Sequence, residues 1–188
     1  MTSETLLSIF LGIGLAASVG FRLFIPLFAL SLAAHLNLLE LNESWEWISS
    51  LTVLVTLGIA TIVEVLAYYI PLVDNLLDTV TVPLAAIAGT AVMLSTIVDL
   101  SPFMTWALSI IAGGGAAVAI AGTSSVVRLT STGTTAGLGN PIISILETVT
   151  SILITVISLF IPILAIILVV IVLFIIFRIY KKFKSSRA

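Results

Sequence analysis

Six ionisable side chains lie within or beside long apolar stretches of the sequence, where a charge is costly to bury. They comprise two arginines and four acids: Arg22, Glu64, Asp74, Asp78, Arg128 and Glu147. An ionised side chain at the centre of a bilayer costs at least about 2.5 to 3.5 kcal/mol on insertion scales, so each of these charges needs a partner or water. Opposite charges on neighbouring helices could supply that partner and form a site for a small anion or a polar solute.

The charges have two interpretations. In the first, they line a polar cavity that binds a solute. In the second, they form buried ion pairs that only fix the packing of helices. Both interpretations predict the same partners, and a cavity between them would favour the first. Asp74 and Asp78 could bind a cation, but two carboxylates without further ligands do not define a metal site, so we expect no metal and no cofactor.

A polar segment at residues 126 to 141, "VVRLTSTGTTAGLGNP", adds two candidate binding residues, Thr135 and Asn140. Free hydroxyls and backbone groups are tolerated at membrane depth only where they line protein or water, so we expect this segment to re-enter the bundle. Asn140 and Pro141 would begin the next helix and aim its positive end at a bound anion. A flexible cytoplasmic loop is the alternative.

The composition identifies the surroundings of these groups. The chain has 188 residues, of which 60% are hydrophobic and 9% charged, with a mean hydropathy of +1.33. Soluble domains carry about 25% charged residues, so lipid must be the solvent for much of this chain. We therefore predict an all-α fold, a polytopic transmembrane helical bundle that forms a single integral membrane domain over residues 1–188.

The apolar stretches predict about six transmembrane spans. Their approximate bounds are 5–36, 51–70, 83–98, 102–122, 141–161 and 162–178. The first is either one kinked span or two half-helices that meet near Arg22. Pro83, with Thr81 as its cap, is expected to start the third span. Residues 141 to 177 would extend about 55 Å as one helix, so we expect a break at Pro162.

Charge placement predicts the orientation. Five of the 7 Lys and Arg residues lie between Arg178 and Arg187, so residues 179–188 form a basic tail that we expect in the cytoplasm. Six spans would then place the N-terminus in the cytoplasm as well. "GIGLAASVGFRL" resembles "GGGAAVAIAGTSSVVRL", and both halves contain an Ile-Pro break, which suggests an inverted repeat of three spans plus three.

Three stretches together resemble a bacterial integral membrane family known as domain of unknown function 4126 (DUF4126). They are "GLAASVGFRLFIPLFALSLAA", "EVLAYYIPLVDNLLD" and "STGTTAGLGNPIISILE". The matching positions are Gly20, Arg22, Pro26, Glu64, Pro71, Asp74, Asp78, Arg128, Thr135, Gly137, Gly139, Asn140, Pro141, Ser144 and Glu147. This chain departs from the family pattern at Tyr68, Tyr69 and Thr148, and within "AGTSS", where charged residues are expected. The resemblance implies a bacterial inner membrane location and no particular activity.

The sequence favours a small transporter or channel for a small anion or polar solute. The alternative is a structural or accessory membrane protein that scaffolds a partner complex. An enzyme is disfavoured, because His35 is the only histidine and cysteine is absent. The expected partners are membrane lipid, the solute, and a second copy or another membrane protein, with no nucleic acid.

Overall fold

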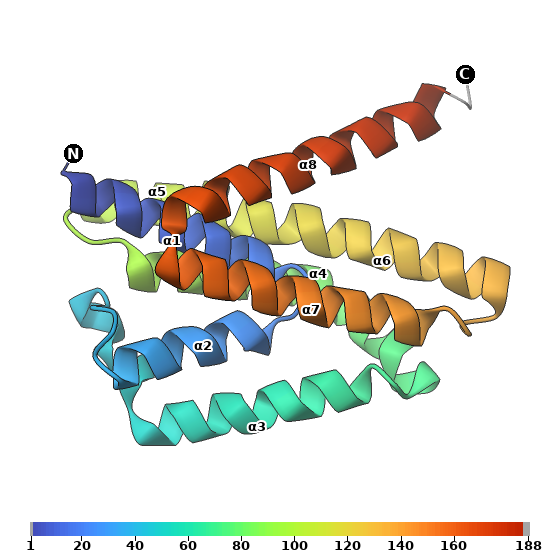
Figure 1. Ribbon diagram of the computed structural model, residues 1–188, viewed down its shortest axis with the longest axis horizontal. Coiled ribbons are helices and arrows are strands. Elements are labelled where there is room, and N and C mark those ends of the chain that lie inside the picture. The colour runs from blue at the N-terminus through green and yellow to red at the C-terminus, as the bar shows by residue number, and fades with distance from the viewer. Residues whose placement is uncertain (1, 186–188) are drawn as a thin grey trace.

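The computed structural model describes the backbone of residues 2–185, and the side chains of that range except those at positions 71, 72, 74, 75, 78 and 179–185. The described part is helical and contains no strand. Figure 1 shows these elements, most of which run along the long axis of the molecule. In chain order they are α1 (Ser3–Val19), α2 (Phe24–His35), the 3-10 helix η1 (Glu43–Ser49), α3 (Leu51–Ala67), α4 (Pro71–Thr96), α5 (Pro102–Leu108), the π-helical segment η2 (Ser109–Gly114), α6 (Gly115–Thr135), α7 (Asn140–Phe160) and α8 (Pro162–Ser185).

Helix α1 lies at the centre of the bundle and contacts α2, α4, α6, α7 and α8. Its inner half is buried, and its side chains pack mainly against small residues of its neighbours. The largest apolar cluster contains Leu11, Leu15, Val19, Leu30, Ala85, Ala88, Val92, Ala117 and Ala121. Small residues let helix backbones approach closely, which is the usual way that membrane helices gain packing contacts.

The first two helices form a hairpin. The outer end of α1 meets the C-terminal end of α4, where Val98 N donates to Ser8 Oγ at 3.4 Å. The chain that leaves α2 meets the same end of α4, where Asn42 N donates to the Ser95 carbonyl at 2.9 Å. The chain therefore reverses direction at residues 20–23 and returns to the end from which it started, as Figure 1 shows.

This reversal resolves the alternatives for residues 5–36. The stretch forms two helices that meet near Arg22, and a single kinked span is not formed. It also changes the topology, because the outer end of α1 and the α6–α7 turn lie at opposite ends of the bundle. The cytoplasmic location of the N-terminus remains a prediction.

The third predicted span does not begin at Pro83. Helix α4 is continuous from Pro71 to Thr96 and contains Pro83 in its interior. Thr81 does not cap a helix start there; its hydroxyl donates to the Leu77 carbonyl at 2.7 Å, one turn earlier. Helix-breaking residues are tolerated inside a membrane helix where hydroxyls and neighbouring helices satisfy the freed backbone groups. For this reason Pro83 was a misleading signal for a helix start.

The Ser/Thr-rich segment is mostly helical. Helix α6 continues to Thr135, and only residues 136–139 connect it to α7, with Ala136 and Gly137 at positive φ. The hydroxyls of Thr130 and Thr134 each donate to the carbonyl four residues earlier at 2.8 Å. Because the hydroxyls bond within the helix, they do not require a loop. The prediction that this segment re-enters the bundle is wrong, and the hairpin lies instead in the first two helices.

Three helical stretches of the described chain are long and apolar enough to cross a membrane, at 79–96, 102–135 and 140–160. Helix η1 with α3, bent by 65°, could provide a fourth. The predicted helix break at Pro162 is present, and α8 begins there. These apolar helices indicate a membrane-embedded protein. The count of six spans and the inverted repeat are not confirmed.

The crossing of α4 with η2 gives a test of packing. A Cβ on Gly89 would lie 2.6 Å from the Ala117 Cβ and 2.9 Å from the Gly113 carbonyl oxygen. We expect Gly89→Ala to lower the free energy of unfolding by about 1 to 3 kcal/mol, the usual cost of overpacking. Thermal unfolding in detergent measures it. Gly115→Ala is the matched control, because a Cβ there meets nothing within 4 Å; equal unfolding temperatures for the two variants would contradict the close approach.

The hairpin can be tested in the membrane, because the natural sequence has no cysteine. We expect single cysteines at Glu4 and Glu43, both exposed, to react with an impermeant maleimide from the same side. A cysteine at Thr134, near the α6–α7 turn, should react only from the opposite side. If α1 and α2 instead crossed the membrane as one span, Glu4 and Glu43 would be labelled from opposite sides.

Candidate functional site

Arg22 lies in the turn at the tip of the α1–α2 hairpin, a region that we call the hairpin tip (residues 20–23). Gly20 allows the turn to pack closely against α6, because a Cβ at this position would lie 2.6 Å from the Ala117 carbonyl oxygen. The Arg22 residue is 1% exposed. The close approach of the turn to α6 thus places a guanidinium group deep in the bundle.

Three groups of α7 hold the Arg22 side chain. Its Nε donates to Thr148 Oγ1 at 3.0 Å, and its Nη2 donates to the Ser144 carbonyl at 2.9 Å and to Ser144 Oγ. The same Nη2 lies 3.7 Å from Glu147 Oε2. Its other terminal nitrogen, Nη1, is buried and makes no hydrogen bond with any described residue.

Glu147 joins the two arginines. Arg128 of α6, 2% exposed, donates from Nη2 to Glu147 Oε2 and from Nε to Oε1, the latter at 3.3 Å. Glu147 is 6% exposed, so its carboxylate is shared between two buried guanidinium groups. Ion pairs of this kind are strongly coupled because little water screens them.

Tyr68 forms one wall of this cluster. The guanidinium carbon of Arg22 lies 3.9 Å from the centroid of its ring, and that of Arg128 lies 4.3 Å from it. Its hydroxyl is 3.0 Å from Thr81 Oγ1 of α4. Stacking of a desolvated cation on an aromatic ring contributes up to about 2 kcal/mol, so the ring compensates part of the cost of burying two cations.

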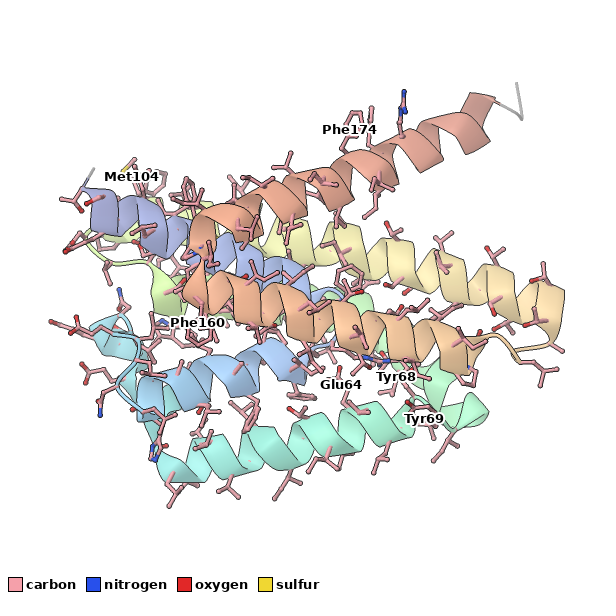
Figure 2. The ribbon with its side chains drawn as sticks, viewed as in Figure 1. Glu64, Tyr68, Tyr69, Met104, Phe160 and Phe174 are labelled. Atoms are coloured by element: carbon pink, nitrogen blue, oxygen red, sulfur yellow. The ribbon has the colours of Figure 1, made fainter. Side chains whose placement is uncertain are left out.

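Glu64 stabilises the start of α2. Its carboxylate accepts hydrogen bonds from Leu23 N at 2.7 Å and from Phe24 N at 3.0 Å. Negative charge is favourable at a helix N-terminus, where backbone N–H groups are unpaired. Figure 2 labels Glu64 and Tyr68 one turn apart at the end of α3, where that helix meets the hairpin tip.

A buried polar stripe on α7 faces the hairpin. Its members recur every three or four residues and so share one face of the helix: Asn140, Ser144, Glu147, Ser151, Thr155 and Ser158. Ser18 of α1 bonds to this stripe, with its Oγ 2.8 Å from the Ser151 carbonyl and 2.6 Å from Thr155 Oγ1. Sequence reasoning missed the roles of Ser18, Ser151 and Thr155, although the polar periodicity along 140–158 would have indicated them.

The remaining predicted site residues differ in their surroundings. Asn140 is buried and donates from Nδ2 to Thr132 Oγ1 at 3.1 Å. Thr135 is exposed at the α6–α7 turn, where its Oγ1 accepts from Gly139 N at 3.0 Å. The side chains of Asp74 and Asp78 lie outside the described residues. The structure therefore brings Arg22, Arg128 and Glu147 together, with Glu64 beside them, and it places Thr135 at the turn.

A groove of about 310 Å³ lies next to the cluster, between α6, α7 and α8. Glu147 lines it, whereas Arg22, Glu64 and Arg128 do not. The charged groups of the cluster pair directly with each other and with backbone groups, and the groove does not join them.

These observations define a helical, membrane-embedded protein with a buried ionic cluster at the tip of a helical hairpin. The family model described as "Domain of unknown function (DUF4126)" matches residues 9–182, so the chain belongs to that family and the resemblance seen in the sequence is confirmed. No curated protein and no solved structure matches the chain.

The shared carboxylate yields a stability prediction. Glu147→Gln should lower the free energy of unfolding by about 3 to 5 kcal/mol, because two buried guanidinium groups lose a common counter-charge. Chemical or thermal unfolding in detergent measures the change. Glu43→Gln, at an exposed position of η1, removes the same charge and should have little effect. Similar stabilities for the two variants would show that the cluster does not need this carboxylate.

Proposed function

We propose that the chain is a small membrane transport protein with a binding site for a small anion at Arg22. The observation that carries this proposal is the close pairing of two buried cations. The guanidinium groups of Arg22 and Arg128 both lie within 4.3 Å of one ring centroid, and Arg22 retains an unpartnered Nη1 at the hairpin tip. Guanidinium donors at a buried position are suited to a small oxyanion or a halide.

The direct pairing of the charges, with no cavity that joins them, favours helix packing, whereas the energetic cost of the cluster is the argument for a functional role. Replacing a buried ionic triad with apolar side chains is often neutral or stabilising, so packing gives little reason to keep two arginines beside each other. Ionisable residues inside a membrane bundle typically mark solute or ion pathways. Burying the guanidinium groups of Arg22 and Arg128 costs desolvation free energy. This cost has a functional explanation if the two groups bind an anion that displaces Glu147. The proposal involves no catalytic chemistry.

The hairpin provides the structural basis for access. We propose that α1 and α2 enter and leave the membrane on the same side, and that α3, α4, α5 to α6, α7 and α8 each cross it. Non-helical backbone such as residues 20–23 is tolerated at membrane depth where protein encloses it, and transporters commonly bind solutes at such breaks. The basic C-terminal tail would lie in the cytoplasm of a bacterial cell, at the inner membrane.

A second candidate function is supported by the direct pairing within the cluster. Glu147 contacts both arginines, and Glu64 is bonded to the α2 backbone. These contacts would suit a structural or accessory protein whose charges only fix its helices. In that case a triple variant should still fold and still associate with its partner membrane protein. The variant combines Arg22→Met, Arg128→Met and Glu147→Met.

Anion flux separates these functions. The full chain would be reconstituted into liposomes, and uptake of chloride, nitrate and inorganic phosphate would be measured. We expect flux of at least one of these probes, and we expect Arg22→Gln to reduce it by about tenfold or more, equivalent to at least about 1.4 kcal/mol. Arg22→Lys, which keeps the charge with fewer donors, should retain part of the flux.

Unfolding temperatures of the same samples show whether a loss of flux reflects loss of the fold. His35→Gln is the control, since His35 lies at the outer end of the same hairpin, away from the cluster, and its Nδ1 is 2.8 Å from the Ser49 carbonyl oxygen. Transport is contradicted if the folded wild type carries none of the three anions, or if Arg22→Gln carries them as fast as the wild type.

A further inference from the structure

The Glu147 carboxylate occupies a position where the two arginines bind two oxygen atoms of one anion. Arg128 approaches it side on, with Nε donating to Oε1 at 3.3 Å and Nη2 donating to Oε2. Arg22 Nη2 lies 3.7 Å from the same Oε2. A guanidinium fork of this kind matches a planar carboxylate, which accepts two parallel N–H bonds. The side chain of Glu147 thus shows which shape of anion these donors hold.

The hydroxyl groups beside the cluster are already committed as donors. The Thr81 hydroxyl donates to the Leu77 carbonyl at 2.7 Å, so the Tyr68 hydroxyl, 3.0 Å from Thr81 Oγ1, is the donor of that contact. The Thr148 hydroxyl donates to the Ser144 carbonyl at 2.8 Å. An anion with more than two oxygens would therefore find few further donors, and a buried polar atom without a partner is costly.

The space at this position limits the anion to about the size of a carboxylate group. Glu147 is 6% exposed, and neither arginine lines the groove beside it. An anion that takes the place of the Glu147 carboxylate therefore gains little more than the volume that this group leaves. Arg22 Nη1, which is buried and makes no hydrogen bond with any described residue, is an additional donor for such an anion.

We propose that the anion bound at Arg22 is a small planar carboxylate of the formate or acetate kind, which takes the position of the Glu147 carboxylate between the two arginines. This inference rests on the proposed function, because it names the class of anion that the site carries. A halide is a single acceptor and cannot match the two-oxygen geometry, and a tetrahedral oxyanion leaves oxygens unpaired. Glu147 is then both a mimic of the substrate and its competitor.

Anion binding to the wild type tests this preference. The unfolding temperature of the full chain in detergent would be measured against anion concentration at constant ionic strength, since a ligand of the native state stabilises it. Acetate would be compared with chloride and with methanesulfonate, which has the same charge and methyl group but a tetrahedral head. We expect acetate to bind at least about tenfold more tightly than either. Arg22→Gln should weaken acetate binding by a similar factor, and His35→Gln should not change it.

Removal of the internal carboxylate provides a second measurement. Glu147→Ala leaves both arginines without their shared counter-charge and should lower the unfolding temperature. We expect formate or acetate to restore much of this loss, and to stabilise the variant more than the wild type, because the internal competitor is gone. Methanesulfonate and chloride should restore little at the same concentration. Glu43→Ala, at an exposed position of η1, is the matched control and should respond as the wild type does.

The outcomes distinguish a failure of this inference from a failure of the proposed function. If chloride or methanesulfonate binds the wild type as tightly as acetate, the carboxylate preference is wrong and an anion site remains. If none of these anions stabilises the wild type, anion binding itself is contradicted and both proposals fail. If Glu147→Ala folds and acetate restores it no better than methanesulfonate, the anion does not take the position of the Glu147 carboxylate. If Glu147→Ala does not fold, the comparison in the wild type decides.

Discussion

The attachment of the hairpin tip to α7 through Arg22 is the interaction on which the rest of the structure depends. The Arg22 side chain bonds to Thr148 and to Ser144, one turn apart on α7, and thereby holds the α1–α2 turn inside the bundle. Without it, the turn at residues 20–23 would lose its side-chain bonds to α7. Glu64 completes the attachment from the other side by accepting hydrogen bonds from the first N–H groups of α2.

The cluster also connects segments that are far apart in the sequence. Tyr68 links the end of α3 to both arginines and, through its hydroxyl, to α4, while Glu147 links α6 and α7 to the hairpin. Further along the bundle the Ser18 contacts with the α7 stripe continue the same interface. The cluster therefore joins α3, α4, α6 and α7 to the α1–α2 hairpin.

The sequence predicted the membrane environment, the break at Pro162 and the charged residues of the cluster, because these depend on composition and on the cost of buried charge. It did not predict the direction of the chain after Arg22. A short break in a helix can be followed by a helix that runs onward or by one that runs back, and the residue types at the break do not distinguish the two. Pro83 indicated a helix start and the threonines of α6 indicated a loop, but both lie inside continuous helices, where the hydroxyls of Thr81, Thr130 and Thr134 bond to carbonyls one turn earlier. The sequence did not predict the stacking of Tyr68 on the two arginines, because that stacking depends on the tertiary fold.

The proposed function requires that Arg22 provides the donor for a bound anion at the hairpin tip. The most direct measurement is an experimental structure of the chain in lipid with bromide present, with anomalous scattering used to locate the ion. We expect bromide within contact distance of Arg22 Nη1, with Glu147 displaced from at least one arginine. Ordered density that leaves Glu147 bridging Arg22 and Arg128, with no bromide at the tip, would contradict it and support a purely structural cluster.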